Sequence, residues 1–142
     1  MTPEARRAIE WDVSRLINQY VNLNDAAEWE AVAALYTEDG SLRRPSGGEP
    51  VRGREAILAA FVARPPRAQR HVIANTVVDV VSETEATAFS VIVLYMGDAA
   101  DDGGLPSKAA NAPLIGTFTD RVMLTDNGWR FAERLGGLDF RP

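Results

Sequence analysis

The chain contains no cysteine and only one histidine, His71, in 142 residues. The lack of cysteine excludes a disulfide framework, thiolate metal sites and cysteine nucleophiles. It also fits a reducing compartment. Because histidine is the side chain that exchanges a proton most readily near neutral pH, histidine-based acid–base chemistry has a single candidate residue here.

Basic charge and long apolar runs are also scarce. The net charge is −5 and lysine and arginine form no run, which argues against binding to nucleic acid or to an anionic membrane surface. No apolar run approaches the roughly 20 residues needed to cross a bilayer, and no signal peptide is visible. We therefore expect a cytoplasmic protein. Phosphate loops, dinucleotide fingerprints and nucleophile elbows are missing too, so no cofactor is expected.

The first half of the sequence has the spacing of helices. Thr2 can cap a helix that begins at Pro3, and apolar residues then recur at helical spacing up to Leu23. A second, shorter helix is expected to point Trp29, Val32, Ala33 and Tyr36 inward and to end at residues 37–40. A short strand over 41–44 and a turn over 45–50 come next. A third helix opens at residues 53–57 and stops at Pro65-Pro66.

The second half has the composition of β-structure. Residues 69–81 and 85–96 are rich in valine and isoleucine, and two further strands are predicted over 114–124 and 129–135. Asp126-Asn127-Gly128 is a strong hairpin signal between the last two. Helices followed by antiparallel strands indicate one α+β domain over residues 1–142. We expect three N-terminal helices packed on a strongly curved, mainly antiparallel sheet that forms a cone with an internal pocket.

Several motifs in order resemble the SnoaL-like domain of the nuclear-transport-factor-2-like superfamily, which has a cystatin-like fold. The resemblance covers nearly the whole chain. Its motifs are Tyr20-Val21-Asn22-Leu23-Asn24-Asp25, Glu28-Trp29, Tyr36-Thr37-Glu38-Asp39-Gly40, Gly53-Arg54-Glu55-Ala56-Ile57, Arg70-His71-Val72-Ile73-Ala74-Asn75 and Asn127-Gly128-Trp129-Arg130-Phe131-Ala132-Glu133-Arg134.

The resemblance implies candidate catalytic residues. The lyase branch of the superfamily, with scytalone dehydratase, bile-acid 7α-dehydratase and a dehydrochlorinase, shares an aspartate at the end of the first helix and a histidine on the first long strand. These correspond to Asp25 and His71. The bile-acid enzyme also has a tyrosine that matches Tyr20 and an arginine that matches Arg134. Scytalone dehydratase has a second pocket histidine, which this chain lacks.

Those residue types suit a cofactor-independent elimination or isomerisation. His71 would be the base, and Asp25 would fix its tautomer and stabilise the imidazolium that forms. Tyr20 could donate a hydrogen bond to a substrate oxygen, and Arg134 could stabilise developing negative charge. A small, mostly apolar cyclic substrate is expected.

Each candidate also has a structural interpretation. Asp25 with Glu28 spells a capping box for the second helix, and a lone histidine on an apolar strand is usually a core residue. Tyr20 lies on the apolar face of its helix, so packing is as good an explanation. Arg134 could pair with Glu133 of a neighbouring chain or with Asp139. Strand parity places it on the face opposite Trp129 and Phe131, unless a bulge intervenes.

The remaining candidates concern the pocket wall and the loop. Asn75 has the same parity as His71, so it could line the pocket or tie down a loop. The segment 97–111 is expected to be a loop, and its acidic cluster over 98–102 is better explained as solvated than as a metal site. Core or pocket-wall positions are expected at Trp29, Tyr36, Phe61, Phe89 and Phe118, and all of these except Phe89 are candidates for substrate binding.

Two functions therefore remain open at this point. The first is a dehydratase-like lyase, isomerase or cyclase, and the second is a non-catalytic ligand-binding protein or an assembly partner similar to a dioxygenase small subunit. Members of the superfamily commonly pair through the open face of the sheet, so a homodimer or higher homo-oligomer is expected in either case.

Overall fold

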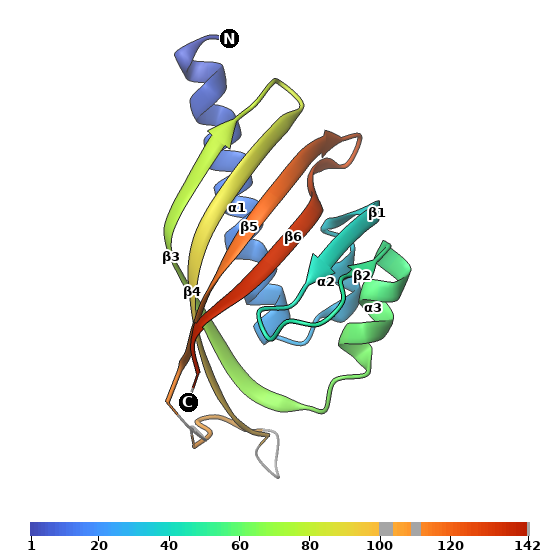
Figure 1. Cartoon of the computed structure of the whole chain (residues 1–142), viewed down its shortest axis with the longest axis vertical. Coiled ribbons are helices and arrows are strands. Elements are labelled where there is room, and N and C mark those ends of the chain that lie inside the picture. The colour runs from blue at the N-terminus through green and yellow to red at the C-terminus, as the bar shows by residue number, and fades with distance from the viewer. Residues whose placement is uncertain (100–103, 109–111, 142) are drawn as a thin grey trace.

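A long first helix packs against one face of a six-stranded sheet in the computed structural model, which describes residues 1–99, 104–108 and 112–141. Figure 1 shows this helix running behind the strands, with the two shorter helices beside the edge of the sheet that β1 and β2 form. The helices are α1 (Pro3–Asp25), α2 (Trp29–Ala33) and α3 (Arg54–Val62). The strands are β1 (Tyr36–Arg43), β2 (Val51–Arg52), β3 (Arg67–Val80), β4 (Glu85–Asp98), β5 (Leu114–Thr125) and β6 (Gly128–Phe140).

The start of α1 follows from its sequence. The Thr2 side chain accepts a hydrogen bond from the backbone N–H of Ala5, and Pro3 occupies the first turn, where its missing N–H costs nothing. Five of the six residues predicted for the buried face are buried, and Leu23 is partly buried. The five are Ile9, Val13, Leu16, Ile17 and Tyr20, and Val21 is buried beside them.

The second helix is shorter than predicted. It ends at Ala33, and Tyr36 to Gly40, which we expected at the inward face and end of a helix, belong to β1. The reason is tertiary: β1 pairs in parallel with β6, with Tyr36 opposite Phe131, and the Phe131 N–H donates to the Leu35 carbonyl at 2.8 Å. Tyr36 is nevertheless buried, so its inward position is retained.

The strand order is β2-β1-β6-β5-β4-β3, and all pairs except β1–β6 are antiparallel. The four predicted long strands are present, and β6 continues five residues past the predicted end at Leu135 to Phe140. The fold is therefore α+β with a six-stranded mixed sheet, and the sheet does not close into a barrel. Its curvature over α1 leaves the space in which the candidate site lies.

Close backbone packing explains the glycine at position 116 of β5. A Cβ on Gly116 would lie 2.2 Å from the carbonyl oxygen of Gly137 on the neighbouring strand, where no side chain fits. The β5–β6 register shifts at this point, between Ile115 and Gly116. Gly116 therefore lets the two strands approach closely beside the cavity described below.

Within residues 1–99, 104–108 and 112–141, no helix combines the length and the apolar character needed to cross a bilayer.

Candidate functional site

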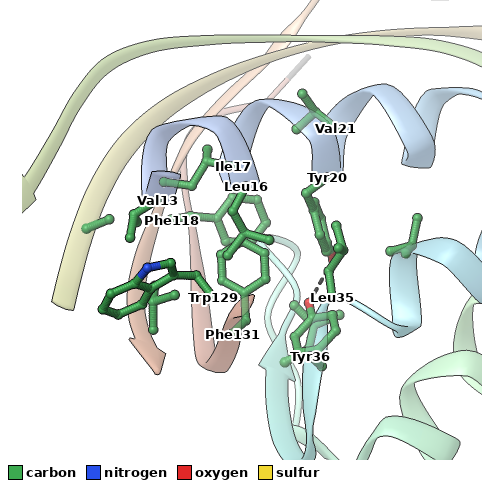
Figure 2. Close-up of a cluster of buried hydrophobic side chains, with 14 of the residues drawn as sticks. Val13, Leu16, Ile17, Tyr20, Val21, Leu35, Tyr36, Phe118, Trp129 and Phe131 are labelled. Atoms are coloured by element: carbon green, nitrogen blue, oxygen red, sulfur yellow. Dashed lines mark hydrogen bonds between the residues drawn. The ribbon is translucent and has the colours of Figure 1, made fainter. Parts of the chain in front are cut away.

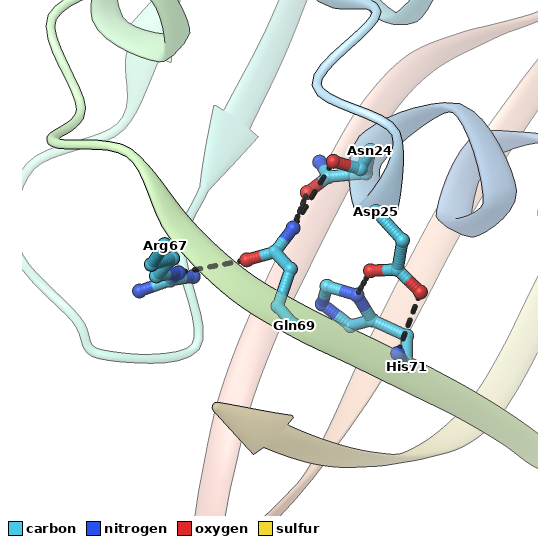
Figure 3. A network of polar contacts seen from close by, with 5 residues as sticks. All are labelled: Asn24, Asp25, Arg67, Gln69 and His71. Carbon is cyan, nitrogen blue, oxygen red and sulfur yellow. Dashed lines mark hydrogen bonds and ion pairs between the residues drawn. The ribbon is translucent and has the colours of Figure 1, made fainter. Parts of the chain in front are cut away.

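Asp25 and His71 meet where the end of α1 crosses β3. The Asp25 carboxylate accepts two hydrogen bonds from His71: Oδ2 accepts from the backbone N–H at 2.8 Å, and Oδ1 lies 2.5 Å from ring Nδ1. Figure 3 shows both contacts. The Asp25 side chain is 3% exposed and that of His71 is 11% exposed. The predicted pair is therefore formed and almost fully shielded from water.

This geometry fixes the orientation of the imidazole ring. An ionised carboxylate can only accept hydrogen bonds, so Nδ1 carries a hydrogen, and in the neutral form of the ring Nε2 is the nitrogen with the free lone pair. No hydrogen bond to Nε2 is formed by the residues that the structure describes. His71 borders the apolar cavity described below, and Asp25 is not among the described residues that line it.

The capping-box interpretation of Asp25 is wrong. Asp25 is the last residue of α1, and α2 begins after Glu28 with no side-chain hydrogen bond at its cap. The three residues between the helices make a tight turn in which Ala27 has a φ of 57°. That turn directs the Asp25 carboxylate toward β3 instead of toward the start of α2.

A polar chain that the sequence did not reveal runs beside the pair. The Gln69 side-chain amide donates to both the backbone carbonyl and the side-chain oxygen of Asn24, at 3.1 and 2.8 Å. The side-chain oxygen Oε1 of Gln69 accepts a hydrogen bond from Arg67 Nε at 2.7 Å. These bonds tie the end of α1 to the start of β3. They hold in register the two elements that carry Asp25 and His71.

An apolar cavity of about 320 Å³ opens beside His71. This volume lies at the lower end of the range for small-molecule sites. Tyr20 and Asn24 contribute polar groups to its wall. Most of the remaining wall is aliphatic or aromatic and includes Leu42, Phe61, Ile92, Leu94, Phe118 and Leu138.

Tyr20 joins the cavity to a buried cluster. Its hydroxyl lies 2.7 Å from the hydroxyl of Tyr36, and its ring packs edge-on against Phe131 with the centroids 5.4 Å apart. Figure 2 shows these rings side by side under α1. Burial raises the pKa of Tyr20 above its ordinary value, and the positive charge of Arg134 offsets only part of that shift. The Tyr20 hydroxyl therefore keeps its proton at neutral pH.

Arg134 lies behind this wall and not at the cavity surface. Its guanidinium is completely buried and donates to both oxygens of Asp120, at 2.7 and 3.1 Å. It also lies over three rings, with its central carbon 4.4, 3.9 and 4.3 Å from the centroids of Tyr20, Phe118 and Phe131. Burial alone would lower the pKa of Arg134, but the charge and hydrogen bonds of Asp120 outweigh burial and raise it.

A β-bulge explains why Arg134 points inward. Arg121 pairs with Glu133 and Val122 with Phe131, so Ala132 is an extra residue in β6. The extra residue reverses the alternation, and Phe131 and Arg134 are both buried although three positions separate them. The expected partners Glu133 and Asp139 are wrong, because Arg134 pairs with Asp120 on β5.

The predicted wall residues divide into two groups. Phe61 and Phe118 line the cavity, whereas Trp29 and Tyr36 are not among the described residues that do so. Trp29 stacks on the far side of Phe61 with the rings 4° from parallel, and Tyr36 lies behind Tyr20.

Asn75 is outside the site. It has a φ of 51° and sits in the bulge of β3 where the register with β4 shifts, between Ala74 and Val77. Asn75 is exposed to solvent. The expectation that Asn75 lines the pocket is wrong, because the bulge breaks the alternation that relates it to His71.

Three arginines at the cavity were missed in the sequence. Arg44 follows β1, Arg64 follows α3, and Arg67 begins β3, and all three border the cavity. Burial lowers the pKa of Arg64 to about 10, and the charges of Arg67 and Arg44 add to the shift. Burial and the charge of Arg44 also lower the pKa of Arg67. No sequence signal marks these residues, because each follows or begins a different element.

The expected loop after β4 lies partly outside the described residues, and so do positions 101 and 102 of its acidic cluster. Over the described part of the chain, no group of three or more histidine, aspartate or glutamate side chains could hold a metal ion.

The comparison with solved structures gives the same fold. A candidate scytalone dehydratase from Novosphingobium aromaticivorans has 23% identity over 98% of this chain and 89% of its own, with a TM-score of 0.82. A nuclear-transport-factor-2-like protein with a cystatin-like fold from the same organism has 24% identity over 89% of this chain and 79% of its own, with a TM-score of 0.68. A protein of unknown function from Mycobacterium tuberculosis has 26% identity over 99% of this chain and 78% of its own, with a TM-score of 0.75.

The family comparison covers most of the chain. The model of the SnoaL-like domain matches residues 5–135, which include every candidate site residue discussed above. The chain therefore belongs to the SnoaL-like domain family.

Proposed function

We propose that the protein is a cofactor-independent lyase or isomerase in which His71 is the base. The observation that carries the proposal is the shielded Asp25 carboxylate, which holds both the backbone N–H and ring Nδ1 of His71 beside an apolar cavity. A buried carboxylate in this position stabilises the imidazolium that forms when Nε2 takes a proton. Among SnoaL-like proteins, the similarity to a candidate scytalone dehydratase favours elimination of water.

The proton balance of such an elimination is simple. Nε2 takes a proton from a carbon next to a substrate carbonyl, and the electron pair of the C–H bond forms the new double bond. The C–O bond on the adjacent carbon breaks, and the departing hydroxide takes the proton back from the imidazolium. For an isomerisation, the imidazolium returns the proton to a different carbon of the same substrate.

In this proposal Tyr20, which lines the cavity, supports the negative charge that develops on the substrate carbonyl. If the Tyr36 hydroxyl donates to Tyr20, the hydroxyl hydrogen of Tyr20 is available to the cavity that Tyr20 lines. Its raised pKa keeps that hydrogen in place at neutral pH. Arg134 does not border the cavity, so we assign it a positioning role, in which its guanidinium fixes the rings of Tyr20 and Phe118.

The test follows proton abstraction directly. The protein is incubated in D₂O with a panel of small cyclic β-hydroxy ketones, and deuterium uptake and loss of water are followed by NMR and mass spectrometry. We expect His71→Ala and Asp25→Asn each to lower the rate by about 10²–10⁴-fold, the usual contribution of a positioned base. Asp79→Asn is the matched control, since it removes an exposed carboxylate from the same strand.

Retained turnover in both variants would contradict the proposal. So would tight binding of panel members with neither deuterium uptake nor product in the unaltered protein, a result that would instead indicate a ligand-binding protein. Circular dichroism and thermal melting of each variant separate loss of catalysis from loss of the fold.

A further inference from the structure

Three cationic side chains gather at one side of an apolar cavity in a chain whose net charge is −5. Arg44, Arg64 and Arg67 come from three different element ends, and all three border the same space. We call them the arginine rim. Salt bridges to any of the three are absent among the residues that the structure describes. A concentration of unpaired positive charge is costly, so its place beside a ligand-sized cavity calls for an explanation.

The rim is held in place by contacts that leave hydrogen-bond donors unused. The Arg64 guanidinium lies over the rings of Trp29 and Phe61, 5.7 and 5.5 Å from their centroids. Arg44 lies over Phe61 at 5.9 Å and donates from Nη2 to the Ala60 carbonyl. Stacking orients a guanidinium without occupying its N–H groups, which remain available to an acceptor.

One of these donors is buried. Arg44 Nε is shielded from water and has no hydrogen-bond partner within the described part of the chain. A buried donor of a charged group without a partner is unfavourable, and a bound oxyanion would satisfy it. Arg67 uses Nε to bind Gln69, which leaves its terminal nitrogens for the same ligand.

The three arginines are close enough for the charge of one to lower the pKa of another. The pKa of Arg64 falls to about 10 because the residue is partly buried and because Arg67 and Arg44 are close. Asp25 is the carboxylate whose charge acts on Arg67, and it is already engaged by His71. A ligand that carries a negative charge would therefore be favoured beside the rim, and the cavity is where it would enter.

We infer that the substrate is an apolar acid, with a carboxylate held by Arg44, Arg64 and Arg67 and a cyclic body that reaches past His71. The fork of a guanidinium matches the two oxygens of a carboxylate, and the mostly apolar remainder of the cavity wall suits a hydrocarbon body. The inference rests on the proposed function only in taking this cavity as the substrate site. It adds that the carboxylate anchors the molecule away from the reacting carbon.

Binding of a matched pair of inert probes tests the inference. The probes are 1-naphthylacetic acid and its neutral amide, 1-naphthylacetamide, measured by calorimetry at pH 7.5 and low salt. We expect the acid to bind at least about tenfold more tightly, as charge-assisted hydrogen bonds to two or three arginines would give. Naphthyl phosphate, with the same body, serves as the comparison anion and is expected to bind no more tightly than the acid.

Variants of the arginine rim test whether these residues cause the preference for the acid over the amide. Arg64→Gln and Arg67→Gln are each expected to weaken binding of the acid by about tenfold and to leave binding of the amide within twofold. Arg43→Gln is the matched control, because Arg43 is the exposed neighbour of Arg44 and does not border the cavity. His71→Ala is expected to keep the preference for the acid, so this result does not depend on whether His71 is the base.

Equal affinities for acid and amide in the unaltered protein would overturn the inference, and so would failure of both probes to bind. Tighter binding of naphthyl phosphate would overturn the assignment of a carboxylate. If a rim variant fails to fold, the comparison of acid with amide on the unaltered protein still decides. Turnover lost in His71→Ala together with equal probe affinities would leave the proposed function intact and remove only this inference.

Discussion

At the scale of single residues, the contact that we expect to be most sensitive to substitution is the buried ion pair of Arg134 and Asp120. Both side chains are completely buried, and the two hydrogen bonds between them form across neighbouring strands. Nη1 of Arg134 is also buried and has no hydrogen-bond partner within the described residues. The pair therefore stabilises the fold because the two buried charges neutralise each other. It also fixes the aromatic rings that lie against the Arg134 guanidinium, next to the cavity.

This pairing predicts a strongly asymmetric response to substitution. Asp120→Asn leaves the Arg134 charge buried without its counter-ion, and we expect it to lower the free energy of unfolding by about 3–5 kcal/mol. Arg134→Met combined with Asp120→Leu removes both charges and is expected to recover most of that loss. Denaturation in urea measures both quantities. Equal destabilisation by the single and the double variant would show that packing, and not charge, dominates at this position.

The sequence identified some of these residues and missed others for physical reasons. Asp25 and His71 could be assigned because they occupy matching positions in a family motif, and the structure brings them together. Asp120 could not be assigned to Arg134, because their pairing depends on the extra residue Ala132 in β6. Alternation along a strand predicts faces only between bulges, and Asn75 was misplaced for the same reason.

At the scale of elements, the arginine rim is made by the ends of β1 and α3 and the beginning of β3. Pro65 and Pro66 stop α3 and set the path into β3, so Arg64 and Arg67 face the same cavity. The sequence gives the boundaries of these elements within a few residues. Which arginines border the same cavity could not be predicted from the sequence, because this depends on how the elements pack against one another.

The position of the rim predicts how acid binding depends on pH. The pKa of Arg64 is about 10, so its charge is present at neutral pH and is lost as the pH rises through that value. A bound carboxylate favours the charged form, so the affinity for 1-naphthylacetate should fall as the pH rises through about 10, by no more than the roughly tenfold loss expected for Arg64→Gln. The other groups acting on Arg64 are the charges of Arg67 and Arg44 and the hydroxyl of Tyr20, which burial keeps protonated.

Calorimetry between pH 7.5 and 10.5 checks this dependence, with 1-naphthylacetamide as the neutral control and Arg64→Gln as the control variant. The control amide should bind equally well throughout, and the variant should show a weaker dependence. The fold should tolerate this range at Arg64, because a lowered pKa in the folded chain means that losing the proton does not cost stability. An affinity for the acid that stays constant up to pH 10.5 would contradict the assignment.

At the scale of the whole molecule, the sheet has one face packed on α1 and another left open. Figure 1 shows the helix lying on one side only. The α+β order and the four long strands could be predicted from the sequence because their hydrophobic patterns are long and regular. The parallel pairing of β1 with β6 could not, because it joins distant segments, and it converted the predicted end of a helix into a strand.

The open face carries three exposed apolar residues in one row. Val77, Phe89 and Leu135 lie in one cross-strand line through Thr119, which joins β3, β4, β5 and β6. The expectation that Phe89 is a core or pocket-wall residue is therefore wrong, because its side chain is on the open face. An exposed row of this kind favours association, since covering it removes apolar surface from water. We propose that a second copy of the chain covers this face and that the protein is a homodimer, as the family resemblance implies.

Sedimentation velocity tests the dimer. The unaltered protein should sediment with twice the monomer mass at micromolar concentration, and Phe89→Glu with Leu135→Glu should give a folded monomer, because two buried carboxylates in each copy would oppose pairing. Trp11→Glu is the matched control, since Trp11 is 71% exposed on α1, away from the open face. A dimer that survives the sheet variants but dissociates with Trp11→Glu would place the interface on the helix. Because the cavity and the row lie on opposite faces, the monomeric variant should still bind 1-naphthylacetate, which would separate assembly from the site.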